Sequence, residues 1–346
     1  MDDRITLSQL TLSQLTVPDA GGDTRDRFGR VKRKLRISLT DRCNFRCPYC
    51  MPVEPDFMPK SQQLTRTELR RLLHLFVSEL GMTQLRLTGG EPLLRRDLEA
   101  IIAECGNLRA VGLQRISMTT NGFLLAKRAR SLKSAGIDDL NVSLDGLTPE
   151  TFAALSGGRE SAPVLAGIEA AVKADLPLKL NTVVVRGVND HELLPLARWA
   201  LIRRLPLRFI EFMPLDGRGG WSKERVFNEA AIIETLSHEF TVTKLERDNS
   251  PATTYLLDGH FPIGIISTVS NPFCSSCDRL RITADGMLYP CLFSATGPSL
   301  RDAMRHGATD TEVLATIRKA VWFKDAGYVS HPGYVKRPIT MHTLGG

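Results

Sequence analysis

The sequence predicts an α/β fold in which parallel strands alternate with helices that cover them. Short apolar and β-branched runs alternate with longer amphipathic segments from about residue 34 to residue 212, which is the pattern of a parallel sheet. Six such units follow one another, and polar or glycine-rich motifs come where most of the runs end. The strand candidates are residues 35–39, 84–87, 115–119, 140–144, 178–185 and 207–212.

The first helix candidate has clear start and stop signals. Thr65 and Glu68 form a capping-box pair, and apolar residues then recur on one helical face until Gly81. Further helices are predicted at residues 124–135, 164–174, 193–201 and 229–240. Because parallel strands place ligand-binding residues on the loops at their carboxyl ends, we expect the functional site on those loops.

After residue 240 the pattern changes to short strands and turns. Asp285-Gly286 predicts a hairpin turn between residues 281–283 and 287–289. We therefore predict three parts, which are a mobile amino-terminal extension, a strand-and-helix region and a smaller carboxyl-terminal α+β domain. Their predicted ranges are residues 1–29, 30–240 and 241–346.

The composition indicates a globular, cytoplasmic protein. Hydrophobic residues make up 42% of the chain and charged residues 24%, and no apolar run is long enough to span a bilayer, so a membrane protein is excluded. Six of the seven cysteines fall in two tight groups, which favours thiolate ligands in a reducing compartment. The net charge of +7 permits an anionic ligand. The sequence lacks the basic, aromatic-interleaved stripe of single-strand binders, so no nucleic-acid partner is expected.

The loop after the first strand contains Cys43, Cys47 and Cys50. Three thiolates cannot saturate a four-iron cluster, so one iron is left without a protein ligand. An open iron can chelate the amino and carboxylate groups of S-adenosylmethionine (SAM) and pass an electron to its sulfonium, which releases a 5'-deoxyadenosyl radical. This motif is typical of radical SAM enzymes. Zinc is the weaker alternative, because it needs four ligands and no histidine lies near the loop.

Cys274, Cys277 and Cys291 form the second group, a CxxC pair followed by a hairpin and one more thiol. A zinc site completed by His260 or His306 remains an alternative here. We favour a second cluster with an open iron, because a chain that builds one cluster under reducing conditions can build another.

Cationic side chains are predicted between the two cysteine groups. Arg279 and Arg281 lie two residues apart on a predicted strand and therefore point to the same side. Arg36 and Arg86 lie within the first two strands, and Lys179 begins the fifth. Since arginine seldom enters an interior without an anion to meet, this set suits a triphosphate substrate.

A glycine-rich turn, Gly89-Gly90-Glu91-Pro92, follows the second strand. By itself it is explained by a tight turn that needs glycine at positive φ. Its position one strand after the first cysteine loop instead favours backbone placed close to a ligand, with Glu91 near the SAM ammonium.

Together these motifs resemble the GTP 3',8-cyclase family, which starts molybdenum cofactor biosynthesis. The resemblance runs from about residue 30 to residue 346 and depends on residues 35–47, 86–92 and 274–281 and on the terminal Gly345-Gly346. It implies a partial (β/α)6 TIM-type barrel with a [4Fe-4S] cluster that binds SAM. A carboxyl-terminal α+β domain would close the barrel and carry a second [4Fe-4S] cluster, which binds the guanine of GTP.

The resemblance also implies roles for individual residues. Both cysteine groups would bind the clusters, and Arg279, Arg281, Gly345 and Gly346 would be catalytic, the two glycines as a tail that reaches the active site. The implied SAM contacts are Tyr49, Gly89, Gly90, Glu91, Ser143 and Met213. The implied GTP contacts are Arg36, Arg86, Thr119, Lys179, Arg279, Leu280 and Arg281.

The implied reaction is that of a lyase. The deoxyadenosyl radical removes hydrogen from C3' of the GTP ribose, the C3' radical attacks C8 of the guanine, and a reduced carrier such as flavodoxin or ferredoxin quenches the aminyl radical. A homodimer is expected, and so is cyclic pyranopterin monophosphate synthase as the next pathway enzyme. The alternative is another radical SAM enzyme with an auxiliary cluster that acts on a peptide or RNA.

Overall fold

One sheet of eleven strands organises the computed structural model, which describes residues 24–215, 217–246, 250–328 and 340–345. The strand order is β11-β10-β1-β2-β3-β4-β5-β6-β9-β8-β7. Strands β1 to β6 are parallel neighbours joined through helices, as the sequence predicts. Their bounds are β1 (Lys34–Ser38), β2 (Gln84–Thr88), β3 (Arg115–Thr120), β4 (Asp139–Ser143), β5 (Leu178–Val184) and β6 (Leu207–Glu211). The predicted α/β fold is confirmed, and each end of a strand lies within one residue of its predicted position.

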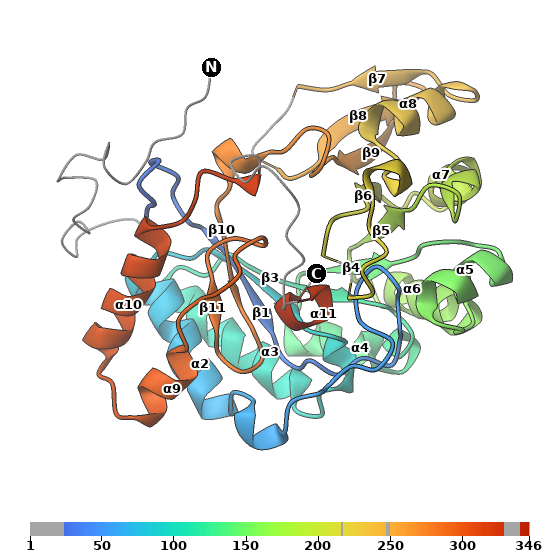
Figure 1. Ribbon diagram of the computed structural model, residues 1–346. Coiled ribbons are helices and arrows are strands. Elements are labelled where there is room, and N and C mark those ends of the chain that lie inside the picture. The colour runs from blue at the N-terminus through green and yellow to red at the C-terminus, as the bar shows by residue number, and fades with distance from the viewer. Residues whose placement is uncertain (1–23, 216, 247–249, 329–339, 346) are drawn as a thin grey trace, which may run out of the picture.

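Apart from the short carboxyl-terminal helix α11, which lies on the cavity side, the helices lie around the outside of the sheet (Figure 1). Thr65 and Glu68 form the predicted capping box at the start of α2, but the helix then widens into a π-helical turn over Leu75–Glu79 before Gly81. The sequence did not predict α5, α9, α10 or α11. The helices are α2 (Arg66–His74), α3 (Leu98–Asn107), α4 (Leu125–Ala135), α5 (Pro149–Ser156), α6 (Ala162–Lys173), α7 (Leu193–Ile202), α8 (Glu229–Ser237), α9 (Leu300–Arg305), α10 (Asp310–Trp322) and α11 (Met341–Leu344). None of the helices in the described ranges is both long and apolar enough to cross a membrane.

The carboxyl-terminal strands extend both edges of the same sheet. Strand β9 pairs in parallel with β6, and β10 pairs in parallel with β1. Their bounds are β7 (Val242–Lys244), β8 (Thr253–Leu257), β9 (Phe261–Ile266), β10 (Arg279–Ile282) and β11 (Leu288–Tyr289). The predicted boundary near residue 240 therefore divides the sequence, while the sheet continues across it.

The sheet separates an apolar core from a polar interior. Leu35 and Ile37 of β1 are fully buried in the core cluster under the helices, whereas Arg36 between them lines the cavity on the opposite face. The same alternation holds in β2, where Leu85 and Leu87 lie in the core and Arg86 lines the cavity.

Part of the predicted mobile extension is folded. Thr24 and Asp26 are buried, and the Thr24 carbonyl accepts a hydrogen bond from the Lys32 amide at 2.8 Å. Residues 1–23 lie outside the described residues.

Candidate active site between two cysteine loops

A cavity of about 520 Å³ lies at the carboxyl ends of the strands and continues into the interior of the sheet. All six cysteines of the two groups line it. Cys50 and Cys274 are 224 residues apart in the sequence. The two cysteine loops nevertheless line the same cavity, because β10 pairs with β1.

The first cysteine loop follows β1. The Asn121 side chain donates to the Cys43 sulfur at 3.7 Å, and the Cys50 amide bonds the Cys47 carbonyl at 3.0 Å. Burial and the Glu91 carboxylate raise the pKa of Cys43 to about 11. Burial, the neighbouring cysteines and a nearby aspartate also raise the pKa values of Cys47 and Cys50. These thiols therefore lie among anionic groups.

The Gly89-Gly90 turn packs directly against this loop. A Cβ atom on Gly90 would lie 2.4 Å from the Arg42 carbonyl oxygen and 2.5 Å from that of Asp41. Gly89 has φ +150°, and a Cβ there would lie 2.4 Å from the Thr40 oxygen. Glycine is required because two backbone segments touch at this point.

Glu91 is buried beneath the turn and does not line the cavity. Its carboxylate accepts from the Thr120 hydroxyl and the Asn121 amide, both at 2.7 Å, and from the Leu93 amide at 2.9 Å. Burial raises its pKa to about 7. Its hydrogen bonds tie the glycine turn to the end of β3.

Tyr49 is fixed by Asp145, which follows β4. Its hydroxyl donates to Asp145 Oδ2 at 2.5 Å, and Asp145 Oδ1 accepts from the Val183 amide at 2.8 Å. Ser143 and Met213 line the cavity as well. Five of the six predicted SAM residues therefore line one cavity, namely Tyr49, Gly89, Gly90, Ser143 and Met213.

The second cysteine group lies across the same cavity. Lys324 Nζ donates to the Cys277 sulfur at 3.2 Å, and Arg279 Nη2 does so at 3.7 Å. Although burial opposes ionisation, the charges of Arg279 and Lys324 lower the pKa of Cys277 to about 6. Burial raises the pKa of Cys274. The Cys277 thiol therefore lies beside two cations.

Neither of the histidines proposed as a fourth zinc ligand lies near this cysteine group. His260 and His306 are exposed and bond the carbonyls of Asp258 and Asp302, and neither lines the cavity. Among the described residues, no three His, Cys, Asp or Glu side chains are arranged to hold a single ion. A four-iron cluster binds each thiolate through a different iron, so it fits cysteines spread more widely than the ligands of one zinc ion.

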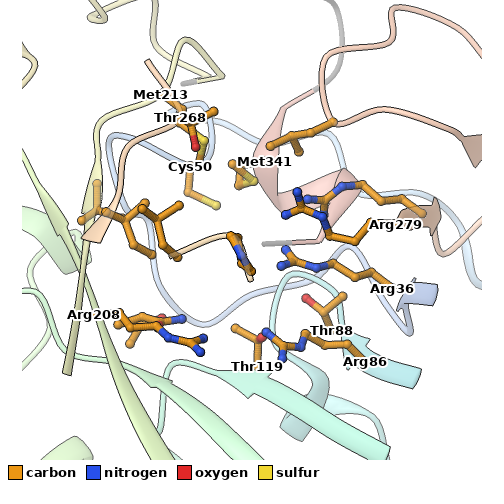
Figure 2. A pocket seen from close by; sticks show the side chains of 18 of the residues that line it. Arg36, Cys50, Arg86, Thr88, Thr119, Arg208, Met213, Thr268, Arg279 and Met341 are labelled. Carbon is orange, nitrogen blue, oxygen red and sulfur yellow. The ribbon is translucent and has the colours of Figure 1, made fainter. Parts of the chain in front are cut away.

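Three arginines form a row across adjacent strands. Arg36 is in register with Arg281 on one side and with Arg86 on the other. Figure 2 shows Arg36, Arg86 and Arg279 pointing from one wall into the cavity, with Arg208 on the opposite wall. Within the described ranges, Arg36, Arg86 and Arg281 form no salt bridge.

The row is under mutual electrostatic repulsion. Burial and the flanking Arg281 and Arg86 lower the pKa of Arg36 well below its ordinary value. Burial lowers the pKa of Arg86 to about 10, and burial with Arg279 lowers that of Arg281 to about 9. A polyanion between these groups would relieve this cost.

Three predicted site residues do not line the cavity with their side chains. Glu91 is one, as described above. Leu280 lies in the hydrophobic core, because alternate residues of β10 face opposite sides of the sheet. Gly345 is held next to the cavity, where its carbonyl accepts from Arg281 Nη1 at 2.6 Å. Gly346 lies outside the described residues.

The remaining predicted residues, Thr119 and Lys179 among them, line the cavity, together with several that the sequence analysis missed. Arg115 and Arg208 are the arginines of that set. They occupy the inward register of β3 and β6, so the alternation that identified Arg36 and Arg86 would have found them. Met341 of α11 also lines the cavity, but no periodic signal marks so short a helix.

Two family models match the chain. The Radical SAM superfamily model matches residues 37–200, and the Molybdenum Cofactor Synthesis C model matches residues 205–330. The first match contains Cys43, Cys47 and Cys50, and the second contains the other cysteine group. The fold and the first loop therefore define a radical SAM enzyme.

Relatives named GTP 3',8-cyclase align over most of the chain. The protein of Corynebacterium glutamicum (strain R) is 44% identical and covers 93% of this chain and 89% of its own length. The protein of Rhodopirellula baltica is also 44% identical and covers 93% of this chain and 91% of its own length. The protein of Streptomyces coelicolor is 42% identical and covers 93% of this chain and 96% of its own length. The chain belongs to the GTP 3',8-cyclase family.

Solved structures share the fold at low identity. SuiB of Streptococcus suis bound to S-adenosylmethionine has a TM-score of 0.56 at 13% identity and covers 88% of this chain and 66% of its own. Native anSMEcpe with bound AdoMet and Cp18Cys peptide has a TM-score of 0.52 at 18% identity, with 83% and 81% covered.

Proposed function

We propose that the protein is a GTP 3',8-cyclase, a radical SAM lyase that converts GTP to 3',8-cyclo-7,8-dihydro-GTP in the first step of molybdenum cofactor biosynthesis. Its cofactors are two [4Fe-4S] clusters and SAM. The observation that carries this proposal is a single cavity lined by both groups of three thiols and by a row of arginines on adjacent strands.

The first cluster would be held by Cys43, Cys47 and Cys50. When bound, this cluster and SAM supply the radical that removes the hydrogen from C3' of the GTP ribose. The Gly89-Gly90 turn lets backbone approach SAM, and Asp145 holds Tyr49 in place for the same ligand. Ser143 and Met213 line its binding space.

GTP would lie between the cysteine loops. Arg36, Arg86 and Lys179 bind its triphosphate, because their charges face the cavity and, among the described residues, form no salt bridge with a carboxylate. Arg279 and Arg281 hold the base near the second cluster, which Cys274, Cys277 and Cys291 would bind. Thr119 contacts the nucleotide from β3. The protein thus acts by positioning and by electrostatic stabilisation.

Gly345 and Gly346 form the tail that completes the site, with the Gly345 carbonyl oriented by Arg281. We further propose that the enzyme works in the cytoplasm as a homodimer. A small redox protein, flavodoxin or ferredoxin, delivers the electrons, and cyclic pyranopterin monophosphate synthase takes the product.

The decisive experiment measures 5'-deoxyadenosine released by anaerobically reconstituted protein. GTP should increase SAM cleavage, whereas ATP or a peptide should not. If ATP or a peptide stimulated this release and GTP did not, the cyclase assignment would be wrong, although the protein would still be a radical SAM enzyme.

Two variants test the role of the arginines. Arg279→Ala and Arg281→Ala should abolish the GTP-dependent increase and leave SAM binding unchanged. Arg318→Ala, a solvent-accessible arginine on α10 away from the cavity, is the matched control. Equal stimulation by GTP in all three variants would contradict the proposed GTP site.

A further inference from the structure

A buried group of charged side chains lies behind the second cysteine loop. Its members are Asp26, Arg30, Lys32 and Lys324, with relative exposures of 1%, 8%, 0% and 4%. Asp26 Oδ2 accepts from Arg30 Nε at 2.6 Å and from Lys32 Nζ at 2.7 Å. None of the four lines the cavity. This group, called here the Asp26 network, therefore acts on the site only through other residues.

The three cations of the network reach the segments that hold the second cysteines. Arg30 Nη1 donates to the Cys274 carbonyl and Lys32 Nζ to the Cys277 carbonyl, both at 2.8 Å. Lys324 donates to the carbonyl of Pro290, the residue before Cys291, at 2.7 Å. The network thus fixes all three positions from one side.

Among the described contacts of the Asp26 network, the contact of Lys324 is the one that involves a sulfur atom. Its ammonium lies 3.2 Å from Cys277 Sγ, the hydrogen-bonding distance of a charged donor to a thiolate. Hydrogen bonds to cluster sulfurs and the net charge around a cluster are two of the factors that set its reduction potential.

The charges of the network do not balance among its own four members. It contains three cations and one carboxylate, and all four side chains are buried. Burial, together with the charge of Lys324, lowers the pKa of Lys32 to about 8. Buried charge is retained where an opposite charge meets it, and a cluster held by three thiolates carries that negative charge.

We propose that Lys324 is a positioning residue for the second cluster, and that its ammonium, held in place with the Asp26 network, raises the reduction potential of that cluster. The inference rests on the second cluster of the proposed function. One extra electron makes the cluster more negative, so a fixed cation nearby favours the reduced state, and the carboxylate of Asp26 opposes it.

The test is an EPR-monitored redox titration of the anaerobic holoenzyme with SAM present, so that the first cluster is recognised by its response to SAM. Lys324→Met keeps the length of the side chain and removes its charge. It should lower the reduced-to-oxidised ratio of the second cluster at a fixed potential by about tenfold, or about 59 mV for a one-electron couple. The first cluster should not shift, and Lys324→Arg should restore most of the wild-type value.

Asp26→Asn provides a test of opposite sign. It removes a negative charge and should raise the second midpoint, which a purely structural role does not predict. Lys319→Met, an exposed lysine on α10, the helix that ends two residues before Lys324, is the control and should change neither midpoint.

The outcomes separate this inference from the proposed function. A wild-type protein without a second cluster would overturn the proposed function. A wild-type protein with both clusters, and a second midpoint that moves in neither Lys324→Met nor Asp26→Asn, would overturn the role of Lys324. If Lys324→Met fails to hold the second cluster, Lys324→Arg and Asp26→Asn decide, because both retain a cation beside Cys277.

Discussion

The two cysteine loops offer the same number of thiols in opposite electrostatic surroundings. At the first loop, burial and anionic neighbours such as Glu91 raise the pKa of Cys43 to about 11. At the second, Arg279 and Lys324 lower the pKa of Cys277 to about 6 despite its burial. Negative surroundings favour the loss of an electron and positive surroundings favour binding of an anion. In the proposed function the first loop holds the cluster that reduces SAM and the second holds the cluster that binds the nucleotide, and the contrast between Cys43 and Cys277 fits these two roles.

The loops also differ in how the chain supports them. The first loop depends on backbone packing, since the Gly90 position has no room for a side chain beside Arg42. The second depends on long charged side chains, including Lys324 and Arg30, that come from distant parts of the sequence. A change in backbone packing should therefore disturb the first loop more than the second. A change of charge should disturb the second loop more than the first.

The largest expected effect is the loss of the first cluster alone. Cys47→Ala should abolish SAM cleavage and leave about four irons per chain, because the second loop is built independently. Cys105→Ala, at a buried cysteine of α3 outside both loops, should keep about eight irons. Iron and sulfide analysis with the SAM cleavage assay measures both. Loss of all iron in Cys47→Ala would show that the loops are not independent.

A single methyl group at Gly90 tests the backbone support of the first loop. Gly90→Ala places a Cβ within 2.4 Å of a backbone oxygen that cannot move without shifting the loop, so SAM cleavage should fall by about a hundredfold, in line with a large steric ΔΔG. Gly106→Ala is the control, because nothing lies within 4 Å of its Cβ. Unchanged SAM cleavage in Gly90→Ala would mean that this contact does not shape the loop.

The opposite surroundings also predict different thiol reactivity in the apoprotein. A thiolate forms as the pH rises through the pKa, so Cys277 should react with iodoacetamide above about pH 6, whereas Cys43 should stay protonated until about pH 11. At neutral pH we expect Cys277 to be labelled at least about tenfold faster than Cys43. Mass spectrometry of peptides labelled between pH 5 and 9 gives both rates. Equal labelling rates would show that Cys277 and Cys43 do not differ in pKa as expected.

The smallest expected effect concerns the carboxyl-terminal tail, which packs against the ends of β1 and β2. Gly345 has φ +75°, and a Cβ there would lie 2.5 Å from Thr88 Cγ2 and 2.7 Å from Ser38 Oγ. Gly345→Ala should therefore displace the carbonyl that Arg281 holds and lower GTP-dependent turnover by roughly threefold to tenfold, within the range of single-residue strain. The affinity for SAM, measured by equilibrium binding, should stay the same. A parallel fall in SAM affinity would contradict a role of Gly345 in the GTP site alone.

Local patterns were sufficient to predict the strands and both cysteine groups. Alternation along β1 and β2 identified Arg36 and Arg86, and the same rule applied to β3 and β6 would have added Arg115 and Arg208. It also explains why Leu280 lies in the core between two cavity arginines.

The features that were not predicted depend on contacts between distant segments. Arg30 bonds the Cys274 carbonyl across 244 positions of sequence, and Lys32 bonds that of Cys277 across 245. No periodicity records such a pairing, so the Asp26 network and the folding of residues 24–29 were missed. For the same reason the sequence did not show that β9 and β10 continue the central sheet.

Mössbauer spectroscopy of oxygen-free protein reconstituted with ⁵⁷Fe tests the central claim most directly. The account predicts two [4Fe-4S] clusters, one whose spectrum changes when SAM is added and another whose spectrum changes when GTP is added. A spectrum with one cluster, together with Zn²⁺ bound by Cys274, Cys277 and Cys291, would contradict it.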